Sequence, residues 1–170
     1  MSLSLKQRRE NAIVALRMIM ENLDETPYEW QEHDATDVRY LAIQRTTWAE
    51  LVRSGYVRAS TFDRYLLTGS GWIAGLKSTG QFADPEFRNK AGRLCAALKL
   101  RVKGRRQMGD ADRTELATET GLSEHWIYNA IDSHLIAEMF DRKDACWAAD
   151  DQMKTAIDIP IDFGYRIERP

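Results

Sequence analysis

The stretch from Arg113 to Phe140, RTELATETGLSEHWIYNAIDSHLIAEMF, contains two helical patterns joined by a short turn. Leu116 lies in the first pattern, and Gly121 tolerates the positive φ that a sharp corner between helices often needs. Ser123 can cap the second helix by accepting a backbone N–H with its hydroxyl. Apolar residues then recur at helical spacing, at Trp126, Ile127, Ala130 and Ile131.

This pattern resembles the helix-turn-helix of bacterial DNA-binding proteins, in which the second helix meets the bases. A second resemblance lies within residues 37–77, where a helix ending at Gly55 is followed by a hairpin, by the pattern Leu-Thr-x-x-Gly and by a new helix. That order is similar to the wing region of winged-helix domains. The two resemblances together imply a mainly α protein with small β hairpins, built from two packed winged-helix-like units.

Amphipathic and β-type patterns give the expected elements of the first half. These are a helix over Leu5–Leu23, a polar link over Asp24–Asp34, a helical stretch over Asp37–Gly55 broken near Arg45–Thr47, a strand at Tyr56–Val57, a turn at Ala59–Thr61, a returning strand from Phe62 to Leu67 and a helix through Trp72.

Turn formers make the segment Ser78–Pro85 the expected linker, so the predicted units are residues 1–80 and 84–170. Asp84 can cap a helix over Pro85–Val102. After the helix-turn-helix, Ile136–Phe140 either pairs with Ala145–Ala149 as a wing hairpin, which we favour, or continues the helix. The tail from Ala156 to Ile167 is expected to be extended, because Pro160 restricts it to a sheet edge.

The chain carries a net charge of −2, unevenly distributed. Residues 86–106 contain eight basic side chains and one acidic, whereas residues 107–170 contain fourteen acidic and six basic. A general DNA-coating protein would be basic throughout. The basic helix can therefore contact phosphates, or it can pair with the acidic part of the same or another molecule and promote self-association.

Catalytic and cofactor signatures are weak, so an enzyme is the minority hypothesis. The run TGSGWIAG from Thr68 to Gly75 has glycines that could hold a dinucleotide phosphate, but a second parallel strand is not evident. His125, Asp132 and His134 lack an evident further metal ligand. Cys95 and Cys146 stand apart and are expected to be reduced thiols. We therefore predict no cofactor, metal site or catalytic residue.

The leading hypothesis is a sequence-specific DNA-binding protein, such as a transcriptional regulator. In the first unit the expected recognition helix offers Arg45, Thr47 and Arg53, and the wing offers Arg58 and Arg64. In the second unit Asn129 could bond adenine, with His125 beside it. Phosphate contacts are expected from the end of the basic helix and the loop after it, at Arg101, Lys103, Arg105 and Arg106.

The alternative is a winged-helix module that binds a protein and not DNA. Glu124 and Asp132 would face a polyanion on the second helix, which has no basic residue, whereas Trp126 and Tyr128 suit a protein contact. Pairing of these carboxylates with the basic helix would favour DNA, and their exposure would favour a protein partner. Because no apolar run reaches the length of a membrane span and no signal peptide is recognised, we expect a cytoplasmic protein without membrane contact.

Overall fold

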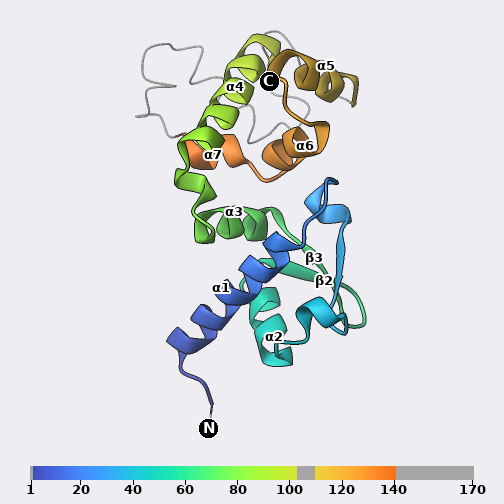
Figure 1. The fold of residues 1–170 in the computed structure, drawn as a ribbon, viewed down its shortest axis with the longest axis vertical. Helices are drawn as coiled ribbons and strands as arrows, with labels where there is room; N and C mark the ends of the chain where they lie inside the picture. The colour runs from blue at the N-terminus through green and yellow to red at the C-terminus, as the bar shows by residue number, and fades with distance from the viewer. Residues whose placement is uncertain (1, 103–109, 141–170) are drawn as a thin grey trace, which may run out of the picture. The chain divides into compact units, whose positions relative to one another are not determined.

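The structure is a computed structural model that describes residues 2–102 and 110–140 (Figure 1). It divides into two compact units, Met1–Gln81 (unit 1) and Phe82–Pro170 (unit 2). The boundary falls within the expected linker, where a short 3-10 turn, η3 (Gln81–Ala83), follows the last helix of unit 1.

Unit 1 combines helices with a small antiparallel sheet (Figure 1). Its elements are α1 (Leu5–Glu21), the 3-10 turn η1 (Tyr28–Trp30), β1 (Glu32–Asp34), the 3-10 turn η2 (Val38–Tyr40), α2 (Arg45–Arg53), β2 (Val57–Thr61), β3 (Arg64–Leu67) and α3 (Gly69–Ser78). The strand order is β1-β3-β2, so β3 lies in the centre and the β2–β3 hairpin forms one side of the sheet. Helix α1 packs against both α2 and α3.

Two details of unit 1 correct the expected strands. Residues 59–61 continue β2 and are not a turn, and the chain reverses at Phe62 and Asp63. Asp63 has φ 57°, a left-handed conformation that short polar side chains tolerate. Strand β1 lies in the segment that was expected to be a polar link. Of its three residues only His33 is buried, so the strand contributes one inward-facing side chain. A three-residue strand with one buried side chain gives almost no periodic signal.

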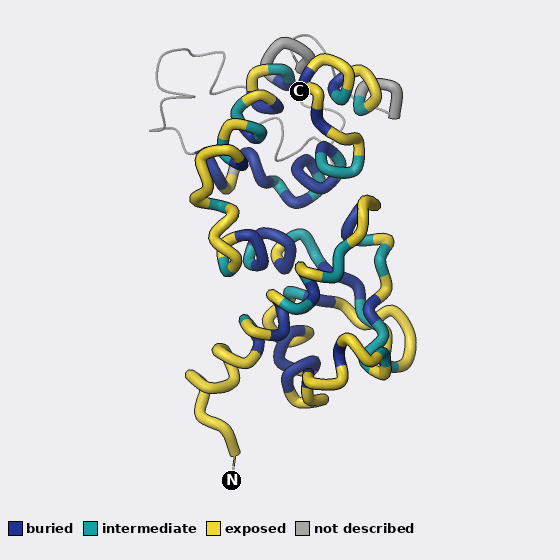
Figure 2. Tube along the Cα trace, viewed as in Figure 1, coloured by how far each residue is buried: buried dark blue, intermediate teal, exposed yellow. Residues whose placement is uncertain are grey.

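The core of unit 1 lies where α1, α2 and the hairpin meet (Figure 2). Its fully buried side chains include Leu16, Ile19, Trp48, Leu51 and Leu67. Their spacing on α1 and α2 places them on one face of each helix, and burying these faces supplies the main stabilising free energy.

The glycine-rich run that could have cradled a phosphate serves helix packing instead. The Thr68 hydroxyl caps α3 by accepting the backbone N–H of Gly71 at 3.0 Å. A Cβ atom on Gly71 would collide with the carbonyl oxygen of Tyr56. This glycine therefore lets the start of α3 lie directly against the backbone that leads into β2.

The described residues of unit 2 form helices and the short connections between them. It comprises α4 (Pro85–Val102), α5 (Asp110–Thr120), α6 (Glu124–Asp132) and α7 (Leu135–Met139). The basic helix has the expected bounds, and Asp84 caps it by accepting the Phe87 N–H at 2.9 Å. Gly121 makes the corner between α5 and α6 with φ 70°. Ser123 is the N-cap residue of α6 as expected, but its side chain makes no capping hydrogen bond.

The favoured prediction of a wing hairpin after α6 is wrong for its first strand, because the segment expected to form it, Ile136–Phe140, lies largely in helix α7. His134 has φ 60° and separates α6 from α7, in which Leu135, Ile136, Met139 and the following Phe140 are buried. This i, i+1, i+4, i+5 spacing places all four on one face of a helix, so helical packing buries them together. Residues 145–149 and the tail at 156–167 lie outside the described residues. None of the described helices is both long and apolar enough to span a membrane.

Candidate nucleic-acid interface

Helix α2 presents one buried and one exposed face. Thr47, Trp48, Glu50 and Leu51 are buried. The opposite face is exposed and consists of Arg45, Thr46, Ala49, Val52 and Arg53. This division follows from helical periodicity, because the exposed positions fall within less than half of the helix circumference. Of the three residues expected to contact DNA from this helix, Arg45 and Arg53 therefore lie on the accessible face.

Thr47 is a correction, because only 7% of it is exposed. It lies one helical step, about 100° around the axis, beyond its neighbour Thr46, which is exposed. Burial keeps the Thr47 side chain from the surface contact that was expected of it, whereas Thr46 is accessible. The two adjacent threonines could not be distinguished until the packing of α2 was known.

The hairpin is held beside the beginning of α2. The rings of Trp48 and Tyr65 stack with centroids 4.4 Å apart and planes inclined by 9°. At the hairpin turn, Asp63 Oδ2 lies 3.8 Å from Nη2 of Arg45, whose side chain is 86% exposed. The Asp63 carbonyl also accepts the backbone N–H of Ala35 at 2.8 Å. These contacts place the turn next to the first residues of the exposed helix face.

The exposed face of α2 borders a hollow of about 540 Å³ that it shares with the start of α1, and Thr46 and Ala49 line this hollow. Arg8 and Asn11 line it from α1, and Glu50 and Arg53 line it from α2. The Glu50 carboxylate accepts two hydrogen bonds from Arg53 Nη2, at 2.8 and 2.6 Å. Arg53, and then the charges of Arg8 and Arg9, lower the pKa of Glu50, so it is a carboxylate at neutral pH.

The two arginines of the hairpin differ in their surroundings. Arg58 is exposed on β2. Arg64 contacts two carboxylates of β1, with Nη1 3.3 Å from Glu32 Oε2 and Nε 3.8 Å from Asp34 Oδ2. Ser60 also donates to Glu32 at 2.6 Å. Arg64 therefore fastens the hairpin to the neighbouring strand, and Arg58 is the more available cation.

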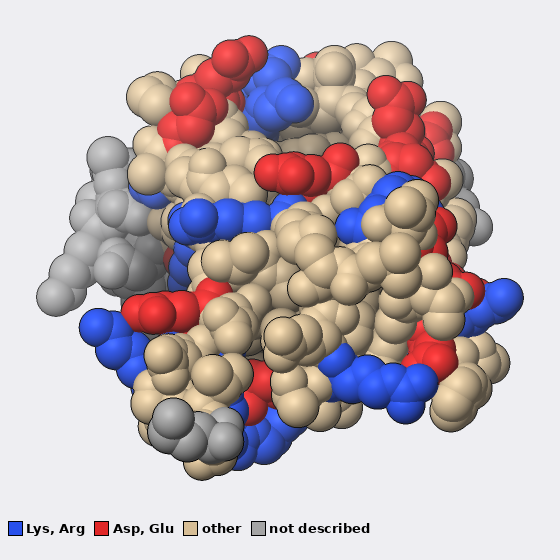
Figure 3. Space-filling view, turned by 60° about the horizontal axis from the view of Figure 1, so that its bottom comes forward, with Lys and Arg blue, Asp and Glu red and all other residues tan. Residues whose placement is uncertain are grey.

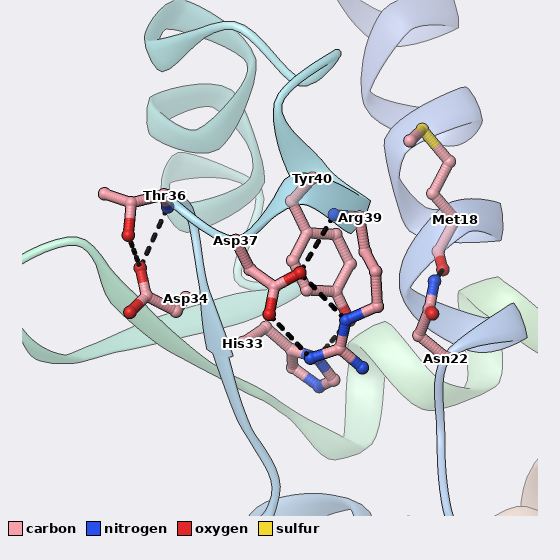
Figure 4. Close-up of polar contacts among 8 residues, drawn as sticks. All are labelled: Met18, Asn22, His33, Asp34, Thr36, Asp37, Arg39 and Tyr40. Atoms are coloured by element: carbon pink, nitrogen blue, oxygen red, sulfur yellow. Dashed lines mark hydrogen bonds and ion pairs between the residues drawn. The ribbon is translucent and has the colours of Figure 1, made fainter.

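A buried polar pair positions the turn before α2 (Figure 4). His33 Nδ1 and the Tyr40 hydroxyl are 2.7 Å apart, and both residues are buried. Burial, followed by the charge of Arg39, lowers the pKa of His33 to about 4, so the imidazole is neutral at pH 7. Asp37 accepts hydrogen bonds from the backbone and side chain of Arg39, which keeps that guanidinium at the surface.

Much of the basic helix α4 faces its own unit. Arg93 Nη1 donates to the Thr120 carbonyl at 2.8 Å, at the end of α5. Arg88 lies 5.6 Å from the centre of the Phe140 ring, and Lys90 lies 6.0 Å from that of Trp126. Three basic side chains are thus used in packing. The phosphate contacts expected at Lys103, Arg105 and Arg106 lie outside the described residues, as does the side chain of Arg101.

Helix α6 does not present the expected recognition surface. Asn129 is 6% exposed, and Ile127, Ala130 and Ile131 are buried with it, so in this structure the Asn129 amide is not presented at the surface as the expected adenine contact requires. His125 is half-buried, and Glu124 is exposed. Asn129 shares its helix face with Ser133, four residues further on, which is also buried. In this structure much of α6 is packed inside unit 2, which leaves little of the helix surface exposed.

Basic and acidic side chains are interspersed on the face of the molecule drawn in Figure 3. Figure 3 shows lysine and arginine side chains in separate groups, with acidic side chains among them. In the described parts of the chain, no cluster of three or more His, Cys, Asp or Glu side chains could hold a metal ion. No protein-family model, curated protein or solved structure matches the chain.

Proposed function

We propose that unit 1 binds duplex DNA as a winged-helix domain, in the role of a transcriptional regulator. The observation that carries the proposal is the exposed face of α2. Arg45 and Thr46 extend from this face, and Ala49 between them is small enough to let the helix approach a groove. In helix-turn-helix proteins the early residues of the second helix contact base edges. Arg45 and Thr46 occupy these positions here.

The order of elements supports this assignment. Helix α1 is followed by the 3-10 turn η1 and then by the edge strand β1, the helical turn η2, the second helix α2 and the hairpin β2–β3. The turn η2 and helix α2 then correspond to the two helices of the helix-turn-helix, and the hairpin corresponds to the wing. The stacking of Trp48 on Tyr65 holds the hairpin beside α2, which supports its assignment as the wing.

The charges around α2 favour an anionic partner. Arg8 and Arg9 are exposed near the start of α1 and make no ion pair within the described residues. The only acidic residue of α2, Glu50, is buried and bound to Arg53. Arg8 and Arg9 are therefore the phosphate contacts we assign to this side, with Arg58 contacting phosphate from the hairpin.

The weak ion pair at Arg45 does not oppose DNA binding. Its partner, Asp63, is 3.8 Å away, and the arginine side chain is almost fully exposed. Exposed pairs of this kind contribute little to stability, because water and salt screen them. Arg45 can therefore exchange the carboxylate for a guanine edge or a phosphate at small cost.

A second candidate function belongs to unit 2. Helix α6 has no basic residue, and the carboxylate of Glu124 is exposed at its start, as are Glu115 and Glu119 on α5. An acidic surface repels DNA and suits a partner protein with a basic surface. We therefore propose protein binding for unit 2.

The aromatic residues expected to contribute to a protein contact are engaged within unit 2. Trp126 contacts the Phe87 ring, and the Tyr128 ring centre lies 5.1 Å from the Arg113 guanidinium.

The test of DNA binding is fluorescence anisotropy with a random 30-base-pair duplex, scanned from low to physiological salt. Wild-type protein should bind, and log K should fall linearly with log salt. Replacing Arg8 and Arg9 by Gln should make that slope shallower by about 2, since each phosphate contact contributes roughly 0.9.

The charge-matched control is the pair Arg17→Gln and Lys77→Gln. Arg17 donates to the Ser78 carbonyl, so this pair lies beside the end of α3. The control should bind like wild type. Equal slopes for all three proteins would remove Arg8 and Arg9 from the interface, and absence of wild-type binding at low salt would refute the proposal for unit 1.

A further inference from the structure

The tip of the β2–β3 hairpin exposes a phenyl ring. Phe62 is 85% exposed, more than any other large apolar side chain among the described residues. A single exposed apolar side chain is common on protein surfaces. Its meaning therefore depends on where it stands and on how firmly the chain holds it there.

Phe62 stands on a well-supported turn. Asp63, the next residue, has a left-handed backbone, and its carbonyl accepts the N–H of Ala35 at 2.8 Å. Tyr65, the second residue of β3, stacks on Trp48 of α2. After the ring the backbone is thus tied to the sheet and to α2, and before it Thr61 is paired with Arg64 in the sheet. An exposed ring on such a support loses little conformational entropy when it binds.

We propose that Phe62 is a wedge that inserts between neighbouring base pairs beside the site of α2. This inference rests on the proposed DNA binding of unit 1. Apolar side chains inserted at a base step partly unstack it and bend the duplex. Pyrimidine–purine steps such as TA unstack most easily and should be the preferred sites.

The surroundings of the ring favour a base over a phosphate. Its neighbours in the turn are Thr61, which is uncharged, and Asp63, whose carboxylate repels phosphate. Arg45 lies beside Asp63 and offsets that repulsion near the helix. Neither Phe62 nor its two neighbours in the turn carries a positive charge that could bind a phosphate. The π face of the Phe62 ring can stack on any base.

The experiment compares wild type with Phe62→Ala and Phe62→Trp, using a 30-base-pair duplex with a central TA step. Fluorophores at both ends report bending by energy transfer, and 2-aminopurine at the step reports unstacking. Wild type should raise both signals. Phe62→Ala should raise neither and should bind roughly 5- to 100-fold more weakly, the range for loss of one base–aromatic stack. Its salt slope should not change, because no phosphate contact is lost.

Phe62→Trp should retain bending and unstacking, and Val14→Ala serves as the matched control. Val14 is an exposed apolar side chain of α1, 55% exposed, and its replacement should leave all three readouts unchanged. Wild-type affinity and bending in Phe62→Ala would overturn the wedge and leave DNA binding by unit 1 intact. Weaker binding by Phe62→Ala without any 2-aminopurine signal in wild type would also overturn it. Absence of wild-type binding at low salt would overturn both proposals.

Discussion

The indole of Trp48 in α2 stacks on the phenol ring of Tyr65 in β3 at a centroid distance of 4.4 Å. Tyr40 of η2 also contacts Trp48, with ring centroids 5.9 Å apart and the two rings nearly perpendicular. His33 of β1 in turn meets Tyr40 edge-on at 5.6 Å. Four aromatic side chains thus connect β1, η2, α2 and the hairpin, and this connection places the exposed face of α2 beside the hairpin tip.

Replacing Trp48 should show how much this connection contributes. Trp48 is 1% exposed, so Trp48→Ala leaves a cavity between α2 and the hairpin. We expect the free energy of unfolding to fall by about 3–5 kcal/mol. Val52→Ala, on the exposed face of the same helix, should change it by about 0.5 kcal/mol. Urea unfolding measures both, and similar losses would contradict the central role of Trp48.

The buried His33 should make unit 1 sensitive to acid. Its pKa is lowered from 6.5 to about 4 in the folded state, so the unfolded chain binds the proton more readily between these values. The stabilising contribution is complete above pH 6.5 and is lost as pH falls toward 4, by at most about 1.4 kcal/mol per pH unit.

Urea unfolding of wild type and His33→Gln at pH 7.5, 6 and 5 measures this effect. Every other ionisable side chain is the same in both proteins, so the difference between them isolates His33. Wild type should lose more stability than the variant over this range. Parallel pH profiles would show that the imidazole is not kept neutral by its burial.

Two helical glycines should respond oppositely to alanine. In Gly71→Ala the new methyl group meets the Tyr56 carbonyl, a backbone group that cannot move aside, so we expect a loss of about 3 kcal/mol. At Gly92 in α4 the same methyl group meets nothing within 4 Å. Gly92→Ala should stabilise by about 1 kcal/mol through helix propensity. Thermal unfolding distinguishes the two, and equal tolerance at Gly71 would mean that α3 can shift away from Tyr56.

The adjacent threonines of α2 should separate stability from binding. Thr47 is buried, so Thr47→Ala should lower stability by about 1 kcal/mol. Thr46 is exposed, so Thr46→Ala should leave stability unchanged and weaken DNA binding by about 1 kcal/mol. Unfolding and anisotropy measured on the same preparations test this. The opposite assignment of effects would indicate that α2 is rotated about its axis in solution.

Local patterns predicted most of the helices. The basic helix, the Gly121 corner and the helix through Trp72 were recognisable, because caps, turn glycines and apolar spacing depend on a few neighbouring residues. Strand β1 and helix α7 were not predicted. A three-residue strand is stabilised by pairing with β3, which is distant in sequence, and α7 by packing against α4. The residues of β1 do not reveal that β3 will pair with them, and the residues of α7 do not reveal that α4 will pack against them.

Candidate contact residues were harder to predict than helices. A helix-turn-helix pattern indicates that α6 is a second helix, but not which of its faces is covered, and the structure buries Asn129 there. Arg8 and Arg9, which we propose as phosphate contacts, were not among the residues expected from the sequence, because they belong to a different helix from the expected recognition helix. Their adjacency in the run Lys6–Arg9 was the available signal. Phe62 was assigned to a strand, where an aromatic residue is ordinary.

The sequence by itself determined where helices start and turn, because those signals act over a few residues and survive without tertiary contacts. Tertiary structure decided which side of each helix is free. Exposure depends on the elements that pack against a helix, so Thr46 and Thr47, or Arg58 and Arg64, have different surroundings although their residue types are the same. The proposed interface of unit 1 therefore depends on the packing of α1 and the hairpin around α2.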